Sequence, residues 1–478
     1  MTSERSNRAA VSEHLLAELE ARAGDFASLA DRIWEYAELG FSEKRSAADQ
    51  IAILEREGFR IRDNIAGMPT AFVAEAGEGG PVIGFLGEFD ALANLSQVPG
   101  LAEQKPLSAD QPGHGCGHHL LGTGSALAAA SVAATLKQQG LPGRVRYYAC
   151  PAEEGGSGKV FMARAGAFDD LDAAFSWHPS SFWGVYASDT LAVIHAIFSF
   201  SGQSSHAAAS PHLGRSALDA AELMNVGVNF LREHMLPEAR VHYAFRDAGG
   251  IAANVVQASS ALSYVIRAPN LSEVLSLFER VKDVGRGAAL MTGTQVEIKV
   301  ESGVSNVLPN SVLETLLDNQ IQQIGGTPFT TQDFAIADTF AATFTTDQVR
   351  HSIRTFGGGI PARRSLHEGI VPFDGKPTRM PVSTDVGDVS WLTPTGRVWG
   401  PCYAIGTSYH SWQMVAQGKL AAAHKGMLQA ARALALAGLN ALGDPELLGR
   451  ARLELEERRN GEPYVCPIPA EVSPALPA

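Results

Sequence analysis

Strands and helices alternate along the first part of the chain, and this order constrains the fold more than any other feature. Strands are predicted at 82–87, 145–150 and 173–177, and an Ala- and Leu-rich helix is predicted at 118–139. Strands that alternate with helices favour a mostly parallel sheet, which binds ligands at the carboxyl ends of its strands. The sequence therefore predicts an α/β fold with its functional loops at one edge of a sheet.

The loops after these strands carry side chains that bind transition metals. Residues 114–119 read His-Gly-Cys-Gly-His-His, and residues 151–156 read Pro-Ala-Glu-Glu-Gly-Gly. Cysteine and histidine are ligands for a zinc-like ion, and hydrolysis also needs a carboxylate that stays free of the metal to move protons. The adjacent Glu153 and Glu154 can divide these two tasks, so a metal-dependent hydrolase is the leading interpretation.

Glycines flank the cysteine of the first loop. We expect Gly115 and Gly117 to adopt positive φ and to turn the side chains of Cys116 and His118 toward one point. For an isolated Cys-x-His pair the alternative is a buried cysteine beside a capping histidine. Further candidate ligands at predicted element boundaries favour the metal site; they are Glu154, His178 and His410.

The chain has 478 residues, which is more than one hydrophobic core of roughly 250 to 300 residues usually holds. Between 192 and 303 the predicted order becomes strand, helix, strand, strand, helix, strand, which is the βαββαβ order of ferredoxin-like units. We therefore predict a domain at 192–303 that is inserted into a first domain formed by 1–191 and 304–478.

The remaining segments are predicted to form helices and one long loop. Helical spacing covers 12–37 with an interruption near Gly24, and the Gly-, Pro- and Arg-rich segment 357–381 predicts a long loop. The helices predicted in the last part of the chain are 310–325, 331–349 and a long helix from His410 or Ser411 to Ala437.

Composition excludes several classes of function. A formal charge of −13 without a long Lys/Arg run argues against nucleic acid as a partner. The N-terminus lacks the apolar core of a signal peptide, and we expect no membrane-spanning run of about 20 apolar residues. The cysteines are widely spaced, without a Cys-x-x-Cys pair, so we expect a cytoplasmic protein without a disulfide framework. They are Cys116, Cys150, Cys402 and Cys466.

Short motifs around the candidate ligands follow one another in a characteristic order. They are Gly87–Leu92, Gly113–His118, Pro151–Gly155, Trp177–Pro179, Ser205–Ala208, Asp247–Gly250, Asn254–Val256, Ser383–Ser390 and His410–Gln413. In this order they resemble the amidohydrolase branch of the aminoacylase and carboxypeptidase-G metallopeptidase superfamily, and within it the aminobenzoyl-glutamate utilization protein B group. The resemblance implies a co-catalytic metallopeptidase domain of the phosphorylase/hydrolase-like type, with an inserted ferredoxin-like lid and dimerisation domain.

The resemblance also implies roles for individual residues. The cofactors would be two divalent metal ions, Zn²⁺ or Mn²⁺, and Glu153 would be the general acid and base. Two ions roughly 3.5 to 4 Å apart would clamp the scissile carbonyl and lower the pKa of a bridging water. The implied metal ligands are Cys116, His118, Glu154, His178 and His410.

Substrate contacts are implied in the same way. His206 would stabilise the tetrahedral oxyanion, often from the partner subunit, although a surface role is the alternative for any single histidine. Asn254 and Arg267 resemble positions that bind the substrate's carboxylate or oxyanion, and a structural ion pair is an equal alternative for Arg267. Supporting roles, which orient imidazoles and fix loops, fall to Asp90, His114 and Asp385.

The chain departs from the family pattern at two places. Glu88-Phe89-Asp90 stands where related proteins have His-x-Asp, so the thiolate of Cys116 is expected in or near the bridging position. His119 follows the metal histidine where the branch has Asp or Asn, so it is expected to tune the metal as an outer partner or to be an extra ligand.

We therefore predict a metal-dependent amidohydrolase that cleaves a small N-acyl or N-aroyl amino acid, similar to aminobenzoyl-glutamate, or a related aryl amide. The alternatives are a dipeptidase or aminoacylase with the same mechanism, and a non-catalytic subunit of a heteromeric hydrolase. The expected partners are a small-molecule amide substrate and a second copy of the chain in a homodimer, or a heteromeric partner subunit.

Overall fold

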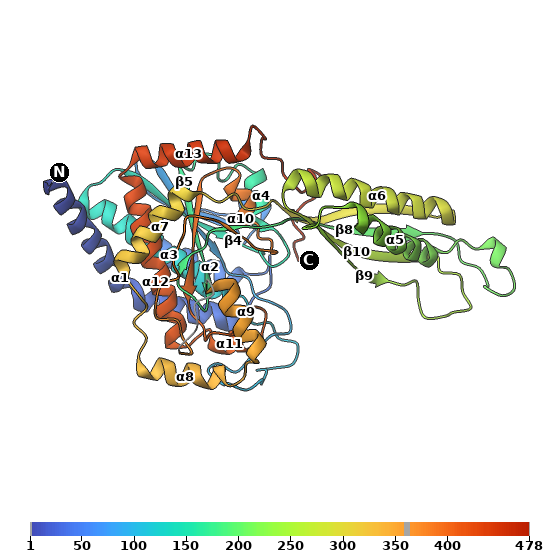
Figure 1. The fold of residues 1–478 in the computed structure, drawn as a ribbon, viewed down its shortest axis with the longest axis horizontal. Coiled ribbons are helices and arrows are strands. Elements are labelled where there is room, and N and C mark those ends of the chain that lie inside the picture. The colour runs from blue at the N-terminus through green and yellow to red at the C-terminus, as the bar shows by residue number, and fades with distance from the viewer. Residues whose placement is uncertain (1, 358–363, 478) are drawn as a thin grey trace.

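The computed structural model describes residues 2–357 and 364–477, which form two units that each have their own sheet (Figure 1). The main unit has a seven-stranded sheet in the order β1-β2-β4-β3-β5-β13-β6, and the second unit has a four-stranded sheet in the order β11-β8-β10-β9. The second unit projects from the side of the main unit opposite to the N-terminus (Figure 1).

The centre of the main sheet is parallel, as predicted, and its edges are antiparallel. Strands β4, β3, β5 and β13 run in one direction, whereas β1, β2 and β6 pair antiparallel with their neighbours. The carboxyl ends of the four central strands therefore meet at one edge of the sheet. The strands are β1 (Arg60–Arg62), β2 (Phe72–Glu78), β3 (Val82–Glu88), β4 (Gly143–Cys150), β5 (Ala173–Ser180), β6 (Gly184–Val185) and β13 (Thr395–Pro401); a separate short pair joins β7 (Ser188–Asp189) to β12 (Thr378–Arg379).

Helices cover both faces of this sheet. Every residue of β3 is buried, and its side chains alternate: Ile83 and Phe85 belong to the core under the long helices, whereas Val82 and Leu86 belong to a separate cluster on the other face. The first core contains residues of α1 (Thr2–Tyr36), α2 (Lys44–Arg56), α3 (His118–Gln139), α7 (Ser311–Ile324), α12 (Ala421–Leu442) and α13 (Pro445–Arg459), and the second contains residues of α4 (Gly158–Arg164) and α10 (Val386–Ser390).

Helix α3 is the central helix of the main unit. By length and composition alone it is long and apolar enough to cross a membrane. Its most apolar window is 94% buried within the protein, where α3 packs between α1, α12 and the sheet. The composition of α3 is thus that of a core helix.

Three predicted helix boundaries are wrong. Helix α1 continues through Gly24, because a single glycine costs only about 1 kcal/mol and the buried face of α1 outweighs it. The helix predicted at 331–349 is divided, since Thr345 caps a new helix. The long helix predicted from His410 is divided as well, and His410 lies before it. The observed helices are α8 (Thr331–Ala341), α9 (Thr346–Phe356), α11 (Trp412–Gln417) and α12.

The second unit has the predicted βαββαβ order. Its strands are all antiparallel, and side chains along β10 alternate between buried and more exposed positions because α5 and α6 cover one face of the sheet. The core of this unit forms a cluster of its own, separate from those of the main unit. The elements are β8 (Ala192–Ser201), α5 (Ala217–Leu231), β9 (Arg240–Asp247), β10 (Ser259–Ala268), α6 (Leu271–Thr292) and β11 (Gln295–Val304).

Candidate metal centre

The loop before α3 places Cys116 and His118 at the carboxyl edge of the main sheet. Gly117 precedes the helix with φ of +83°, as predicted. Gly115 does not have the predicted positive φ. It is needed for space, since a Cβ there would overlap Cδ2 of Leu95 and lie 3.3 Å from the Cα of His410. The backbone N–H of His410 also donates to the carbonyl of Gly115 at 2.8 Å, which joins two loops that are far apart in the sequence.

Two site loops contain a non-glycine residue in the left-handed region. Ala152, directly before Glu153, has φ of 55°, and His410 has φ of 58°. Such backbone costs energy and persists where the surrounding structure fixes it, which is common at functional sites. Ser411 then caps α11, because its side chain accepts a hydrogen bond from the N–H of Met414.

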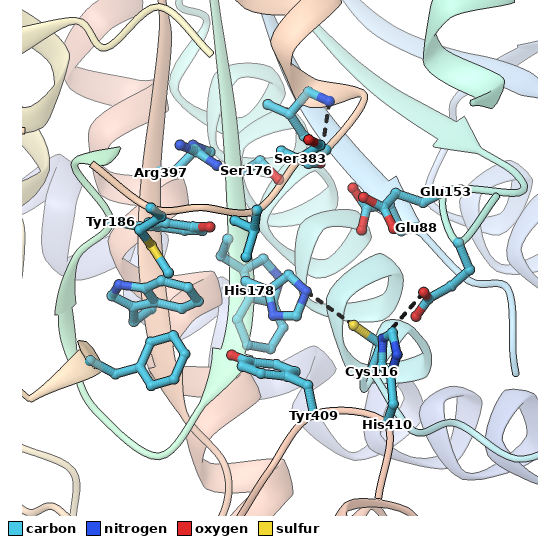
Figure 2. A pocket seen from close by; sticks show the side chains of 18 residues that line it. Glu88, Cys116, Glu153, Ser176, His178, Tyr186, Ser383, Arg397, Tyr409 and His410 are labelled. Atoms are coloured by element: carbon cyan, nitrogen blue, oxygen red, sulfur yellow. Dashed lines mark hydrogen bonds and ion pairs between the residues drawn. The ribbon is translucent and has the colours of Figure 1, made fainter. Parts of the chain in front are cut away.

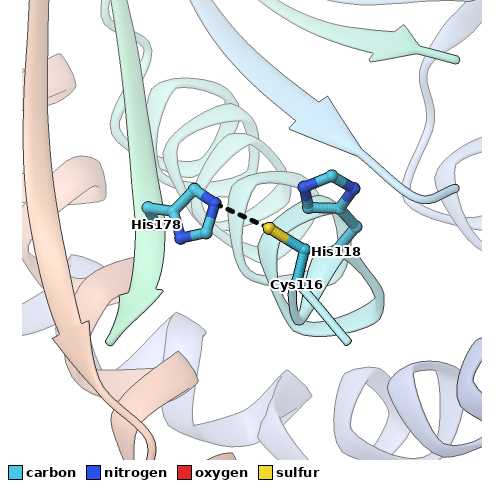
Figure 3. A group of neighbouring side chains, drawn as sticks. All are labelled: Cys116, His118 and His178. Carbon is cyan, nitrogen blue, oxygen red and sulfur yellow. Dashed lines mark hydrogen bonds between the residues drawn. The ribbon is translucent and has the colours of Figure 1, made fainter. Parts of the chain in front are cut away.

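The five predicted metal ligands lie together (Figures 2 and 3). The Sγ of Cys116 is 3.5 Å from Nε2 of His178, and Oε2 of Glu154 is 3.3 Å from Nε2 of His410. Two groups of three donor atoms, each within 4.8 Å of one another, share Cys116: His118 and His178 complete one group, and Glu154 and His410 complete the other. The thiol thus lies between two sets of donors.

Two buried donor atoms in this cluster have no hydrogen-bond partner among the described residues. They are Nε2 of His118 and Oε1 of Glu154. The Nε2 atom is 3.2 Å from Oε2 of Glu88 but without the geometry of a hydrogen bond. Buried polar atoms are nearly always satisfied, so the cluster fits a cation that these atoms would bind.

Neighbouring groups orient two of the imidazoles. Asp90, predicted in a supporting role, is 2.8 Å from Nδ1 of His118, and its second oxygen accepts a hydrogen bond from the N–H of Glu154 at 2.9 Å. Nδ1 of His178 is 2.9 Å from the carbonyl of Pro179, which leaves Nε2 directed at Cys116. Burial, with the nearby His118, lowers the pKa of His178 to about 4, so its imidazole is neutral at pH 7, as a metal ligand requires.

Glu88 and Lys159 are site residues to which the sequence assigned no role. Glu88 ends β3 and forms a third group of donor atoms with His118 and Glu153. Lys159 is completely buried, and its Nζ is 2.6 Å from Oε1 of Glu88 and 2.6 Å from Oδ1 of Asp385. The position of Glu88 at a strand end was the available signal, whereas nothing in the sequence marks Lys159 as buried.

Glu153 lines the pocket beside the donor cluster without belonging to either group that contains Cys116 (Figure 2). Burial raises its pKa well above the usual range of a carboxyl, and the charges of Glu88 and Asp385 add to this effect. The protonated form of Glu153 is therefore more stable than that of an ordinary exposed carboxyl.

His114 and His119 interact away from the donor cluster. Nε2 of His114 is 3.0 Å from the carbonyl of Ile33, and Nε2 of His119 is 3.0 Å from the carbonyl of Gly418. The two rings pack with their centres 4.9 Å apart. None of the groups of potential ligands found in residues 2–357 and 364–477 includes either histidine. Their contacts instead join the start of α3 to α1 and to the segment before α12.

The predicted substrate contacts lie in the second unit. Nδ1 of His206 accepts hydrogen bonds from the N–H groups of Ala208 and Ala209, and neither His206 nor Asn254 lines the pocket at the donor cluster. Arg267 lies closer to the pocket. Its Nη1 donates to Oγ of Ser383 at 2.6 Å, and Ser383 lines the pocket. The chain by itself thus brings the ligands together but not His206 and Asn254.

The donor cluster opens into a cavity of about 270 Å³ with an aromatic wall (Figure 2). Tyr186 and Trp399 stack with ring centres 3.5 Å apart, and Tyr409 meets His178 edge-on at 5.2 Å. Phe356 contacts both Trp399 and Tyr409. This wall provides an apolar surface directly beside His178 of the donor cluster.

Replacing Lys159 with methionine is expected to lower the free energy of unfolding by about 3 to 5 kcal/mol. The change leaves the buried carboxylates of Glu88 and Asp385 without their cation. Urea denaturation of the metal-free protein and of the variant measures this difference in the free energy of unfolding. Lys419→Met is the control, since Lys419 pairs with the more exposed Glu35 at 2.6 Å, and exposed pairs contribute roughly 0 to 1 kcal/mol. Equal losses in the two variants would contradict the role of Lys159.

Comparison with known proteins identifies the family. The model of peptidase family M20/M25/M40 matches residues 85–472. The chain is 43% identical over 467 residues to one subunit of the p-aminobenzoyl-glutamate hydrolase of Escherichia coli (strain K12), covering 96% of this chain and 97% of the relative. It is 30% identical to Xaa-Arg dipeptidase of Mus musculus, covering 92% and 90%.

Solved structures share the fold. The aminobenzoyl-glutamate utilization protein from Klebsiella pneumoniae has a TM-score of 0.59 at 20% identity, covering 88% of this chain and 97% of that one. A dinuclear metal-binding M20 peptidase from Bacillus subtilis has a TM-score of 0.56 at 19% identity, covering 89% and 99%. These findings confirm the resemblance inferred from the motifs: the chain belongs to peptidase family M20/M25/M40.

Proposed function

We propose that the chain is a two-metal amidohydrolase that cleaves the amide bond of a small N-acyl or N-aroyl amino acid. One observation carries this proposal: thiol, imidazole and carboxyl donors from four separate segments converge at one end of a pocket, and a spare carboxyl, Glu153, lies beside them (Figure 2). The donors are those of Cys116, His118, Glu154, His178 and His410.

Two cations would fit this donor set, in which the sulfur of Cys116 is the donor common to both groups. His118 and His178 would complete one site, and Glu154 and His410 the other. Sulfur, nitrogen and oxygen ligands together suit Zn²⁺ and also Mn²⁺. When bound, such ions polarise the scissile carbonyl and acidify the attacking water.

Glu153 would move the proton in both halves of the reaction. As a carboxylate it accepts a proton from the attacking water, and as a carboxylic acid it donates that proton to the nitrogen of the departing amine. Burial and the charges of Glu88 and Asp385 raise its pKa, which favours the protonated form that the second step needs.

The aromatic wall supports an aromatic acyl group as the preferred substrate part. Tyr186, Trp399, Phe356 and Tyr409 surround the cavity next to His178, and aromatic rings pack favourably against one another. The relative that is 43% identical is named as part of a hydrolase of p-aminobenzoyl-glutamate, which has such an acyl group. We therefore propose an N-aroyl amino acid as the substrate class.

The second unit would serve as a lid and as the contact to a partner. Apolar side chains on its helices are unusually exposed, including Phe230 at 72% and Leu290 at 84%. A homodimer through this unit would bring His206 and Asn254 of one copy toward the pocket of the other. A heteromeric partner is the second candidate, because the relatives include two different subunits of the Escherichia coli hydrolase, at 43% and 29% identity.

The test uses the purified chain alone, loaded with Zn²⁺ or Mn²⁺. We expect two bound ions per chain and release of amine from N-aroyl amino acids, with a solution mass of twice the chain. Metal binding without turnover, restored by addition of the 29% identical subunit of the Escherichia coli hydrolase, would favour the heteromeric assembly. Absence of bound metal would reject the proposed mechanism.

A further inference from the structure

Glu43 is a completely buried carboxyl that the proposed mechanism leaves without a role. It is 0% exposed, and it stands directly before α2, where a polar side chain often caps the helix. The side chain of Glu43 makes no such cap. Glu38 caps α2 instead, because its carboxylate oxygens accept hydrogen bonds from the N–H groups of Arg45 and Ser46 at 3.0 and 2.9 Å. The carboxyl of Glu43 is therefore available for other contacts.

The carboxyl of Glu43 reaches the loop that carries Glu153. Its Oε1 accepts a hydrogen bond from the N–H of Ala152 at 2.9 Å, and its Oε2 accepts one from Oγ1 of Thr70 at 3.0 Å. Ala152 and Thr70 are themselves buried. Ala152 directly precedes Glu153 and has a left-handed backbone with φ of 55°. Glu43 thus satisfies the backbone donor of a strained residue next to the proposed acid and base.

A second carboxyl holds the other side of Glu153. Oδ2 of Asp90 accepts a hydrogen bond from the N–H of Glu154 at 2.9 Å. The N–H groups of the residues on either side of Glu153 are therefore bound by two buried carboxyls from separate segments of the chain. A loop residue that is held on both sides loses conformational freedom, and such preorganisation favours catalysis by the side chain it carries.

The packing around Ala152 leaves little room for another conformation of this loop. A Cβ atom at Gly40 would lie 2.8 Å from Cβ of Ala152, and one at Gly156 would lie 2.6 Å from it. Gly40 precedes Glu43 by three residues, so the segment between α1 and α2 contacts the loop through both a glycine backbone and a carboxyl. The position of the loop is thus set from outside the pocket.

We propose that Glu43 is a positioning residue that, together with Asp90, fixes the backbone of Glu153 in its place beside the donor cluster. This inference rests on the proposed function, in which Glu153 moves the proton. Glu43 does not line the pocket, so it would act only through the loop. A displacement of the acid and base by about 1 Å costs roughly 100-fold in rate. The competing explanation is that Glu43 only stabilises the fold.

Glu43→Met and Glu43→Gln separate the two explanations. Methionine keeps the length of the side chain but leaves the N–H of Ala152 unpaired. We expect kcat to fall by roughly 10 to 100-fold, while KM and metal content stay unchanged. Burial, with the charge of Asp90, raises the pKa of Glu43 to about 8, so the native carboxyl is largely neutral at pH 7. A glutamine amide can replace it in both hydrogen bonds and should restore most of kcat.

Glu38→Met is the matched control. It removes two hydrogen bonds to backbone N–H groups in the same segment without affecting Ala152, so it should lower stability and keep kcat. Full kcat in Glu43→Met, equal losses of kcat in the two methionine variants, or a glutamine variant as slow as Glu43→Met would each overturn the proposal. If Glu43→Met does not fold, Thr70→Val removes the other partner of the carboxyl. It should lower kcat, and an unchanged kcat would overturn the proposal.

Hydrogen exchange tests the same link without turnover. The backbone amides of 152–154 should exchange faster in Glu43→Met than in the unmodified protein, in Glu43→Gln and in Glu38→Met, because the loop opens more often when its N–H is no longer held. Unchanged exchange of these amides in Glu43→Met would reject the role of Glu43. Absence of amidase activity in the unmodified protein would instead reject the proposed function, so the two failures are distinguishable.

Discussion

Replacement of Glu153 by glutamine is expected to leave both metal ions bound while turnover falls by roughly 10² to 10⁴-fold. The variant keeps the size of the side chain but can no longer accept the proton of the attacking water or pass it to the amine. Glu153 lies outside both donor groups that contain Cys116, so metal binding should be retained. Elemental analysis of the purified variant and steady-state kinetics with an N-aroyl amino acid measure the two quantities.

Measuring metal content and turnover together distinguishes an acid and base from a metal ligand. Loss of metal together with turnover would assign Glu153 to the ligands, and full activity with glutamine at 153 would exclude it as the acid and base. The effect should be in kcat, because the proton moves in the transition state and not in the binding of substrate.

Replacement of Cys116 by alanine is expected to remove both metal ions together and to abolish turnover. Its Sγ is the donor that the two groups share, so the change affects the His118 side and the Glu154 side at once. The loss of metal affinity should exceed the roughly 10 to 100-fold that changes in outer partners of ligands cause. Titration with Zn²⁺ or Mn²⁺, followed by calorimetry, measures the affinity.

Cys402→Ala provides the matched control. Cys402 is also a buried free cysteine of the main unit, but it belongs to none of the donor groups found among the described residues. This variant should bind two ions and retain activity. If Cys116→Ala still bound one ion with unchanged affinity, the thiolate would not be shared between the two sites.

The metal ligands could be predicted from the sequence because most of them lie at or after the carboxyl ends of predicted strands. Glu154 follows β4, His178 lies near the carboxyl end of β5, and Cys116 lies in the loop before α3. The parallel sheet therefore brings these residues to one edge. The prediction for His410 was partly wrong: we expected it at the start of a long helix, but it lies in the loop before α11. The roles of His206 and Asn254 stay predictions, because both residues lie in the second unit and neither lines the pocket.

The residues that the sequence did not reveal are those whose role depends on tertiary contacts. Lys159 has no distinctive neighbours in the sequence, and its importance comes from complete burial between Glu88 and Asp385. Arg397 and Tyr186 belong to segments far apart in the chain, and only the packing of β13 against the preceding strands makes them neighbours. Periodicity indicates which residues face a core but does not indicate which buried charges pair with one another.

The pairing of β8 with β11 has a consequence for the architecture of the molecule. Val193, near the start of one strand, lies opposite Val304, at the end of the other, so the chain leaves the main unit and returns to it about 5 Å apart. A tight turn of two residues bridges such a gap. The whole projecting module can therefore be exchanged or excised at a single junction without rethreading the remaining polypeptide.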